Sequence, residues 1–186
     1  MNAYDFDKTI YGGDSTVDFY LFSLKRHPSI LRFAPKQAWA FLLYALGRIR
    51  KTEMKERFFS FFQSLDTEGE VELFWQKHEC KIYSFYLKQK REDDVVISAS
   101  PEFLLRPICR KLGVGRLLAS RVDPKNGVYT GENCYGEEKV RRLFEDCGIR
   151  AVDEFYSDSV SDLPMAKIAK RAFLIQKGTV VDWKIH

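Results

Sequence analysis

Asp5-Phe6-Asp7-Lys8-Thr9 is the stretch that decides how this chain folds. Residues 2–7 are predicted to form a short strand that leads directly into the two acids. Residues two apart in a strand point to the same face, so a loop at the strand end can aim Asp5 and Asp7 into one pocket. Two carboxylates this close repel each other unless a cation or a shared proton relieves them. The alternative is a strand end or helix cap with two solvated acids.

Composition limits the class of protein. A chain of 186 residues forms one domain, or one domain with a modest insertion. The net charge of +4, without a basic run interleaved with aromatics, argues against a dedicated nucleic-acid binder. No signal peptide is expected, because acids replace its apolar core. The longest apolar run, residues 38–46, is well below the roughly 20 residues of a membrane span.

Cysteine usage favours a reducing compartment. The four cysteines are widely spaced, with no C-x-x-C pair and no zinc-site spacing. We therefore expect free thiols and a cytoplasmic location.

Residues 16–89 are predicted to form one helix after another, without a strand. Apolar residues recur at helical spacing, and Gly12-Gly13-Asp14-Ser15 forms a turn and a helix start. Helices are expected from about 16 to 27, from 35 to 48, from 52 onward and from 68 to 87. The region is interpreted as a helical insertion, residues 13–90, between two parts of a core, residues 1–12 and 91–186.

From Asp94 onward strands and helices alternate. Val95-Val96-Ile97 is a β-branched run typical of a strand buried on both faces. Further strands are expected at 117–122, 155–156 and 172–175, helices at 103–112, 137–147 and 163–170, and a hairpin at 123–131 with Asn126-Gly127 as its turn. This order predicts an α/β fold, a Rossmann-like, doubly wound, mostly parallel sheet with helices on both faces.

Polar residues follow the predicted strands or begin a helix. In a parallel sheet such residues gather at the carboxyl edge, where ligands bind. Carboxylates suit a hard cation such as Mg²⁺, and a lysine with a serine hydroxyl suits a phosphate. An acid beside a metal-bound phosphate suits phosphoryl transfer. The residues are Asp5, Asp7, Ser98, Ser100, Lys139, Asp158 and Asp162.

In order and spacing, these residues resemble the four motifs of the haloacid dehalogenase (HAD) superfamily. The motifs are Asp5-x-Asp7-x-Thr9, Ser98 after an apolar strand, Lys139 in a helix, and Asp158-x-x-x-Asp162. The chain is most similar to the phosphoserine-phosphatase-like branch, which carries a helical cap just after the first motif. The resemblance covers essentially the whole chain and implies an Mg²⁺-dependent phosphatase.

The resemblance also implies a role for each motif residue. Asp5 would be the nucleophile that forms an aspartyl-phosphate, and Asp7 would protonate the leaving alcohol and then activate water. Ser98 would bind a phosphate oxygen, and Lys139 would stabilise the charge on Asp5 and the phosphoryl group. Asp158 would bind Mg²⁺ together with the Asp5 side chain and the Asp7 carbonyl. Thr9 would hold the loop in shape, and Asp162 would orient Lys139 and metal-bound water.

Each motif residue also has a structural interpretation. Ser98 could simply end a strand, and Lys139 could be a solvated helix residue. Asp158 and Asp162 could cap the following helix. The ordered set as a whole favours the functional interpretation.

Three positions depart from the phosphoserine phosphatases. Their second-motif serine is followed by two glycines, whereas Ala99 and Ser100 stand here, and the Ser100 hydroxyl could donate to phosphate. By spacing, Asp14 takes the place of their substrate-reading Glu and Arg57 that of their cap Arg. Asp14 could instead be an N-cap, and Arg57 a solvated residue. These departures make phosphoserine a doubtful substrate.

One expected cap helix is apolar nearly all round. We expect this surface, formed by Trp39, Phe41, Leu42, Leu43, Tyr44 and Leu46, to be buried cap core, and Phe58, Phe59, Phe61 and Phe62 likewise. The alternative is a basic-edged surface that lies on a membrane or accepts a lipid-like leaving group.

Three functions remain open on this reading. The expected one is hydrolysis of a small phosphorylated metabolite. The alternatives are a phosphatase of phospholipid headgroups at a membrane surface, an activity that some members of this branch have, and a catalytically silent module that binds a phosphorylated ligand.

Overall fold

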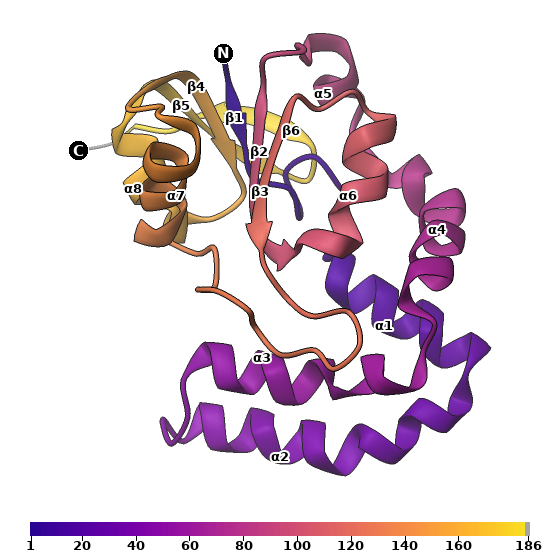
Figure 1. Ribbon diagram of the computed structural model, residues 1–186. Coiled ribbons are helices and arrows are strands. Elements are labelled where there is room, and N and C mark those ends of the chain that lie inside the picture. Colours follow the sequence, from indigo (N-terminus) through magenta and orange to yellow (C-terminus); the bar gives the residue numbers. More distant parts are fainter. Residues whose placement is uncertain (185–186) are drawn as a thin grey trace.

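A six-stranded sheet forms the centre of the computed structural model, which describes residues 1–184 (Figure 1). The strand order is β3-β2-β1-β4-β5-β6, and only the last pair, β5 and β6, is antiparallel. The prediction of a mostly parallel α/β sheet is confirmed. The strands are β1 (Ala3–Tyr4), β2 (Val95–Pro101), β3 (Arg116–Ser120), β4 (Val152–Ser157), β5 (Ala169–Gln176) and β6 (Thr179–Asp182).

The central strands β1 and β2 are buried on both faces, and their successive residues alternate between two hydrophobic clusters. In β1, Ala3 belongs to one cluster and Tyr4 to the other. In β2, Val95 and Ile97 face the first cluster while Val96 faces the second. This alternation follows from the two-residue period of a strand. It explains why the sequence of a central strand is continuously apolar.

Helices cover the two faces. On one face lies α6 (Glu102–Lys111), and on the other lie α7 (Glu137–Cys147) and α8 (Leu163–Lys167) (Figure 1). α7 has the predicted bounds, and it ends at Gly148, whose φ of 69° is the left-handed conformation that glycine adopts readily.

Helices make up most of residues 15–89, as predicted, but the last predicted helix is divided into two. The helices are α1 (Ser15–Arg26), α2 (Ala34–Ala45), α3 (Lys51–Phe59), α4 (Thr67–His78) and α5 (Ser84–Gln89). The prediction of one helix over 68–87 is wrong because Ile82 forms an antiparallel bridge with Tyr11. The Tyr83 N–H donates to the Ile10 carbonyl at 2.8 Å. This pairing of distant segments is invisible to local periodicity.

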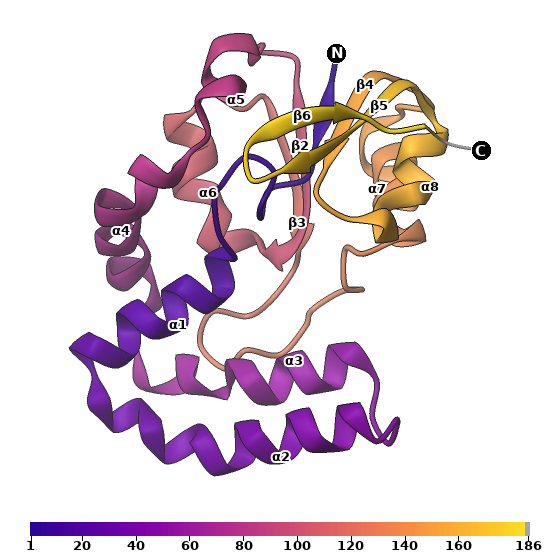
Figure 2. The same cartoon turned by 180° about the vertical axis from the view of Figure 1, so that it is seen from behind.

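Two other expectations differ from the structure. The predicted hairpin at 123–131 is a turn closed by one bridge, Val122 to Tyr129, with the Gly127 N–H donating to the Asp123 carbonyl. The sequence analysis also missed β6, which pairs with β5 through a tight turn (Figure 2). Lys177 and Gly178 in that turn both have positive φ, as two-residue hairpin loops require.

The helical region packs on the core through aromatic side chains. α4 lies beside α6 in both views (Figures 1 and 2), and the Trp75 indole N–H donates to the Leu104 carbonyl at 2.6 Å. Phe59, Phe61 and Phe62 are buried in the same hydrophobic cluster as the side chains of α6.

The expectation that the apolar surface of α2 is buried is wrong. Only Gln37 and Ala40 are buried in this helix, whereas Trp39 is 56% exposed. α2 packs against α3 on one side and carries apolar residues on the other sides as well. Within residues 1–184, no helix is both long and apolar enough to cross a bilayer.

Candidate active site

A cavity of about 580 Å³ lies at the carboxyl ends of the central strands. Asp5 follows β1, Ser98 lies in β2, and Asp158 follows β4, and all three line the cavity. Their gathering at this edge is the consequence of parallel strands whose ends meet on one side. Residues of α1 and α3 form the opposite wall.

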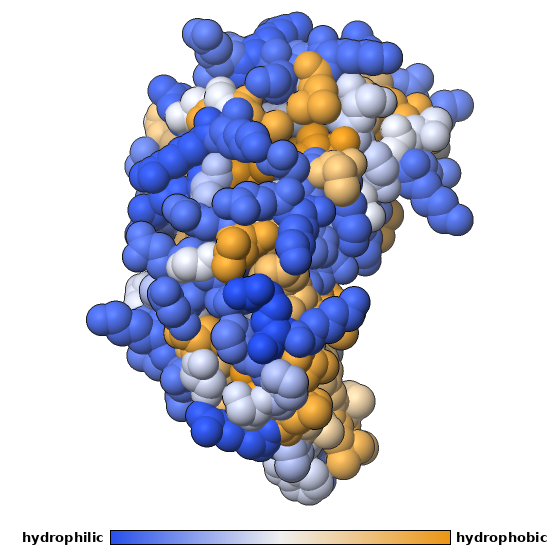
Figure 3. Space-filling model, turned by 90° about the vertical axis from the view of Figure 1, so that its right-hand side faces the viewer, coloured by the Kyte–Doolittle hydropathy of each residue, from blue (hydrophilic) through white to orange (hydrophobic). Residues whose placement is uncertain are grey.

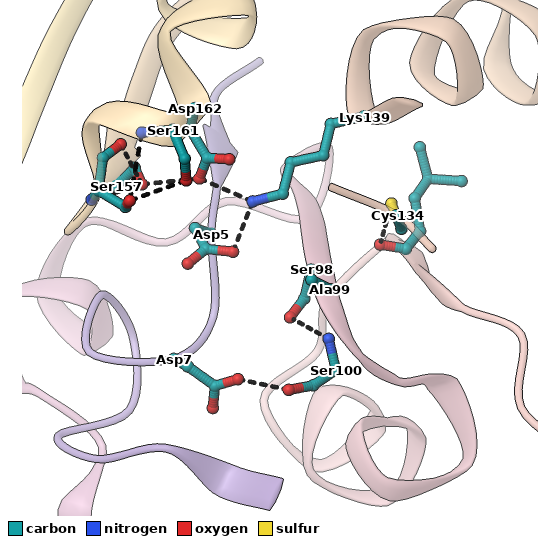
Figure 4. A network of polar contacts seen from close by, with 12 residues as sticks. Asp5, Asp7, Ser98, Ala99, Ser100, Cys134, Lys139, Ser157, Ser161 and Asp162 are labelled. Atoms are coloured by element: carbon teal, nitrogen blue, oxygen red, sulfur yellow. Dashed lines mark hydrogen bonds and ion pairs between the residues drawn. The ribbon is translucent and has the colours of Figure 1, made fainter. Parts of the chain in front are cut away.

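Lys139 holds two carboxylates together at the base of the cavity (Figure 4). Its ammonium group donates to Asp5 Oδ1 and to Asp162 Oδ2, each at 2.7 Å. The lysine is only 2% exposed, so it is not a solvated helix residue. Asp162 does not cap α8 with its side chain, since it accepts from Lys139 and from the Ser157 hydroxyl at 2.8 Å.

Burial and mutual charge determine the protonation of this group. Burial has the largest effect on Asp5 and raises its pKa, against the opposing effect of Lys139. Burial would lower the pKa of Lys139, but the charges of Asp5 and Asp162 outweigh it and raise that pKa. Lys139 is therefore a fixed positive charge beside Asp5.

Asp7 sits in a separate set of hydrogen bonds. Its Oδ1 accepts from the Ser15 N–H at 2.7 Å. Its Oδ2 accepts from the Ser100 hydroxyl at 2.5 Å (Figure 4). Burial, followed by the charge of Asp14, raises the pKa of Asp7 to about 6. The next residue, Lys8, has a φ of 55°, and this left-handed turn reverses the chain directly after the carboxylate.

The segment Ser98-Ala99-Ser100 faces both acids. Ser98 Oγ accepts from the Ser100 N–H at 3.1 Å, and both serines line the cavity. The hydroxyl of Ser100 contacts Asp7, a contact that the sequence analysis did not anticipate. Thr9 is fully buried behind the loop, and among the described residues its hydroxyl oxygen has no hydrogen-bond partner.

The acids of the cavity offer oxygen ligands for a hard cation. Asp5 and Asp158 both line the cavity, and burial raises the pKa of each, a cost that a bound cation would offset. Within residues 1–184, no three His, Cys, Asp or Glu side chains form a ready-made metal cluster. The Mg²⁺ ligands expected from the sequence are the carboxylates of Asp5 and Asp158 and the backbone carbonyl of Asp7. This set does not need a third side chain.

The two predicted substrate-reading residues lie in different surroundings. Asp14 lines the cavity and also caps α1, since its Oδ1 accepts from the Thr16 and Val17 N–H groups. Arg57 does not line the cavity, and its guanidinium pairs with Glu53 at 2.6 Å on the surface of α3.

Two lysines of α3, Lys51 and Lys55, line the cavity, and Lys55 is the more deeply placed of the two because it contacts the segment after Ser98. The Lys55 ammonium group donates to the Ala99 carbonyl at 2.9 Å, and burial, followed by the charge of Lys51, lowers its pKa to about 8. The sequence analysis missed this residue. The signal was the helical spacing of Lys51, Met54, Lys55 and Phe58, which places them on one face and leaves Arg57 out of phase.

Comparison with known proteins identifies the family. The model of the haloacid dehalogenase-like hydrolases matches residues 3–167. The chain belongs to this family. The HAD resemblance and the expectation of an enzyme are thereby confirmed.

A curated relative matches part of this HAD chain. It is named a probable phosphatase of Mycobacterium tuberculosis, and it is 38% identical over 93 residues. The match covers 45% of this chain and 31% of the relative, so the chain matches about a third of that protein's length.

Solved structures share the fold. A Bordetella pertussis protein of unknown function has a TM-score of 0.73 at 22% identity, over 92% of this chain and 87% of that one. A phosphoserine phosphohydrolase-like protein from Francisella tularensis has a TM-score of 0.60 at 14% identity, covering 92% and 84%. A substrate-bound phosphoserine phosphatase has a TM-score of 0.56 at 18% identity, covering 92% and 83%.

Proposed function

We propose that this HAD enzyme is an Mg²⁺-dependent phosphatase that hydrolyses phosphomonoesters through an aspartyl-phosphate on Asp5. The observation that carries the proposal is the pairing of Asp5 with a buried lysine at the base of a cavity that Asp7 also lines. The family match and the name of the mycobacterial relative support the same activity. The intact acid pair argues against a silent binding module.

In the first step Asp5 acts as the nucleophile and Asp7 as the proton donor. Lys139 occupies Asp5 Oδ1, so the other oxygen, Oδ2, attacks phosphorus while the bond to the leaving oxygen breaks. Asp7 gives its proton to that leaving oxygen, and the alcohol departs. The raised pKa of Asp7 suits this step, since more of the acid is protonated near neutral pH than an ordinary aspartate would be.

The second step restores the enzyme. Asp7, now ionised, takes a proton from water, and the water oxygen attacks phosphorus as the bond to Asp5 breaks. Inorganic phosphate leaves, and Asp5 is again a carboxylate beside Lys139. Ser98 and the positive charge of Lys139 stabilise the phosphoryl oxygens in both steps.

We propose that Asp5, Asp158 and the Asp7 carbonyl hold the Mg²⁺ ion. When bound, the cation neutralises negative charge on the phosphoryl group. The buried carboxylates and the oxygen donors of the cavity support this assignment.

We also propose a core of residues 1–12 and 91–186 and a cap of residues 13–90. The position of α2 and α3 beneath the sheet supports this division (Figure 1). The four free cysteines support a reducing compartment such as the cytoplasm.

Replacement of the nucleophile tests the proposal. Asp5→Asn keeps the shape of the side chain but removes the attacking charge. We expect no measurable turnover of p-nitrophenyl phosphate with Mg²⁺, and an unchanged circular dichroism spectrum. Wild-type activity in Asp5→Asn, or no hydrolysis of any phosphomonoester by the wild type, would refute the proposed function.

A further inference from the structure

The charge of the chain is distributed unevenly. The segment 19–52 contains seven Lys and Arg residues and no Asp or Glu. Its charge of +7 exceeds the net charge of +4 of the whole chain, so the rest of the protein is acidic. This segment comprises most of α1, all of α2 and the start of α3.

The same segment carries the exposed apolar surface of α2. Trp39, Leu42 and Leu46 are each about half exposed or more, with Leu46 at 63%. Figure 3 shows hydrophobic residues gathered at the foot of the molecule, where Figure 1 places α2 and α3. Four exposed basic residues flank this surface in the sequence: Arg32, Lys36, Arg48 and Arg50.

The apolar surface continues into the catalytic cavity. Phe41 of α2 is 47% exposed, lines the cavity and packs edge-on against Phe58 with ring centroids 5.8 Å apart. Val17 and Leu21 of α1 are also exposed and also line the cavity. A leaving group that extends from the phosphate toward α2 therefore meets an apolar wall that opens onto the α2 surface.

We infer that the substrate is a phosphomonoester on the headgroup of a membrane lipid, and that the α2 surface rests on an anionic membrane to reach it. This inference rests on the proposed phosphatase activity and names its substrate class. The apolar side chains of α2 enter the headgroup region, and the flanking Arg and Lys residues bind acidic lipids. The apolar cavity wall accepts the lipid part next to the phosphate.

Charge favours a membrane over a second copy of the chain as the partner of this surface. A twofold dimer would place the same acid-free segment of both copies face to face, which brings like charges together. An anionic bilayer instead supplies both the apolar phase and the negative charge.

Vesicle sedimentation tests the surface. The full chain should bind vesicles that contain phosphatidylglycerol and only weakly those of phosphatidylcholine alone. Leu46→Glu and, independently, Arg50→Glu should each weaken binding about fivefold or more. The matched control is Leu87→Glu, an exposed leucine on α5 that should bind as the wild type does. Equal binding by all variants, no binding to anionic vesicles, or a dimer that Leu46→Glu dissociates would overturn the inference.

Activity separates this inference from the proposed function. The wild type should hydrolyse phosphatidic acid in anionic mixed micelles at least tenfold more efficiently than glycerol phosphate, and Leu46→Glu should lose that preference while keeping activity on p-nitrophenyl phosphate. Hydrolysis of p-nitrophenyl phosphate without preference for any lipid-borne phosphomonoester would overturn the substrate class alone. Failure to hydrolyse any phosphomonoester would overturn both.

Discussion

Lys139 Nζ lies 2.7 Å from Asp5 Oδ1, although the two residues are 134 positions apart. The same ammonium group also contacts Asp162, so one buried cation separates two buried carboxylates. Removing one partner of such a buried ion group strongly destabilises the folded protein, because the remaining charges stay buried without compensation. Lys139 is therefore needed for the stability of the fold as well as for the proposed chemistry.

Lys139→Met should destabilise the protein at neutral pH. The loss leaves Asp5 and Asp162 facing each other, with a cost of about 3–5 kcal/mol in the free energy of unfolding. Unfolding in urea measures this free energy and its midpoint. Lys170→Met removes an exposed lysine from an ion pair with Asp153 and should leave the midpoint unchanged. A Lys139→Met midpoint equal to that of the wild type would contradict the account.

Lys55→Met should weaken substrate binding, whereas Arg57→Met should not. The two residues lie on the same helix, but only Lys55 lines the cavity. Loss of a charged hydrogen-bond donor should raise KM for a phosphomonoester about tenfold or more. Steady-state kinetics of both variants test this prediction. A larger increase in KM for Arg57→Met than for Lys55→Met would restore Arg57 as the substrate-reading residue.

Asp7→Asn should show an effect that depends on the leaving group. An alkoxide needs a proton to depart, and a nitrophenolate does not. We expect kcat to fall by about 10²–10⁴ for an alkyl phosphate and far less for p-nitrophenyl phosphate at saturating substrate. Equal losses for both substrates would show that Asp7 is not the proton donor.

Glu70 should make stability depend on acid pH. Burial opposes ionisation of Glu70, but hydrogen bonds from His27 and Arg26 outweigh it and lower its pKa below the ordinary 4.5. The stabilisation is then complete above about pH 4.5 and is lost as pH falls through the lowered value.

Glu70→Gln measures this contribution. The variant should be less stable by about 1 kcal/mol at pH 7 and should lose less stability than the wild type between pH 5 and 3, roughly the range in which a paired carboxylate protonates. Thermal unfolding across that range checks it. Glu72→Gln, at an exposed position of the same helix, is the control. Parallel pH curves for Glu70→Gln and the wild type would contradict this role.

The sequence predicted those features that local pattern or parallel topology determines. The β-branched run at Val95 and the periodicity of 137–147 indicated their elements directly, and strand ends indicated where Asp5, Ser98 and Asp158 would meet. The bridge of Ile82 to Tyr11 and the contact of Ser100 with Asp7 depend on three-dimensional proximity, which no local pattern contains.

The α2 helix shows a second limit of sequence reasoning. Its apolar composition predicted burial, but burial also requires a neighbouring element to cover each face. Lys55 shows a third limit, because alignment by residue count selected Arg57, whereas helical phase selects the residue that faces the cavity.

Rapid-quench mass spectrometry tests the central claim most directly. Wild-type protein mixed with Mg²⁺ and p-nitrophenyl phosphate, then quenched in acid and digested, should carry one phosphoryl group on the peptide that contains Asp5. Asp5→Asn should carry none. Hydrolysis by the wild type with no phosphorylated intermediate, or with the phosphoryl group on another residue, would contradict the account.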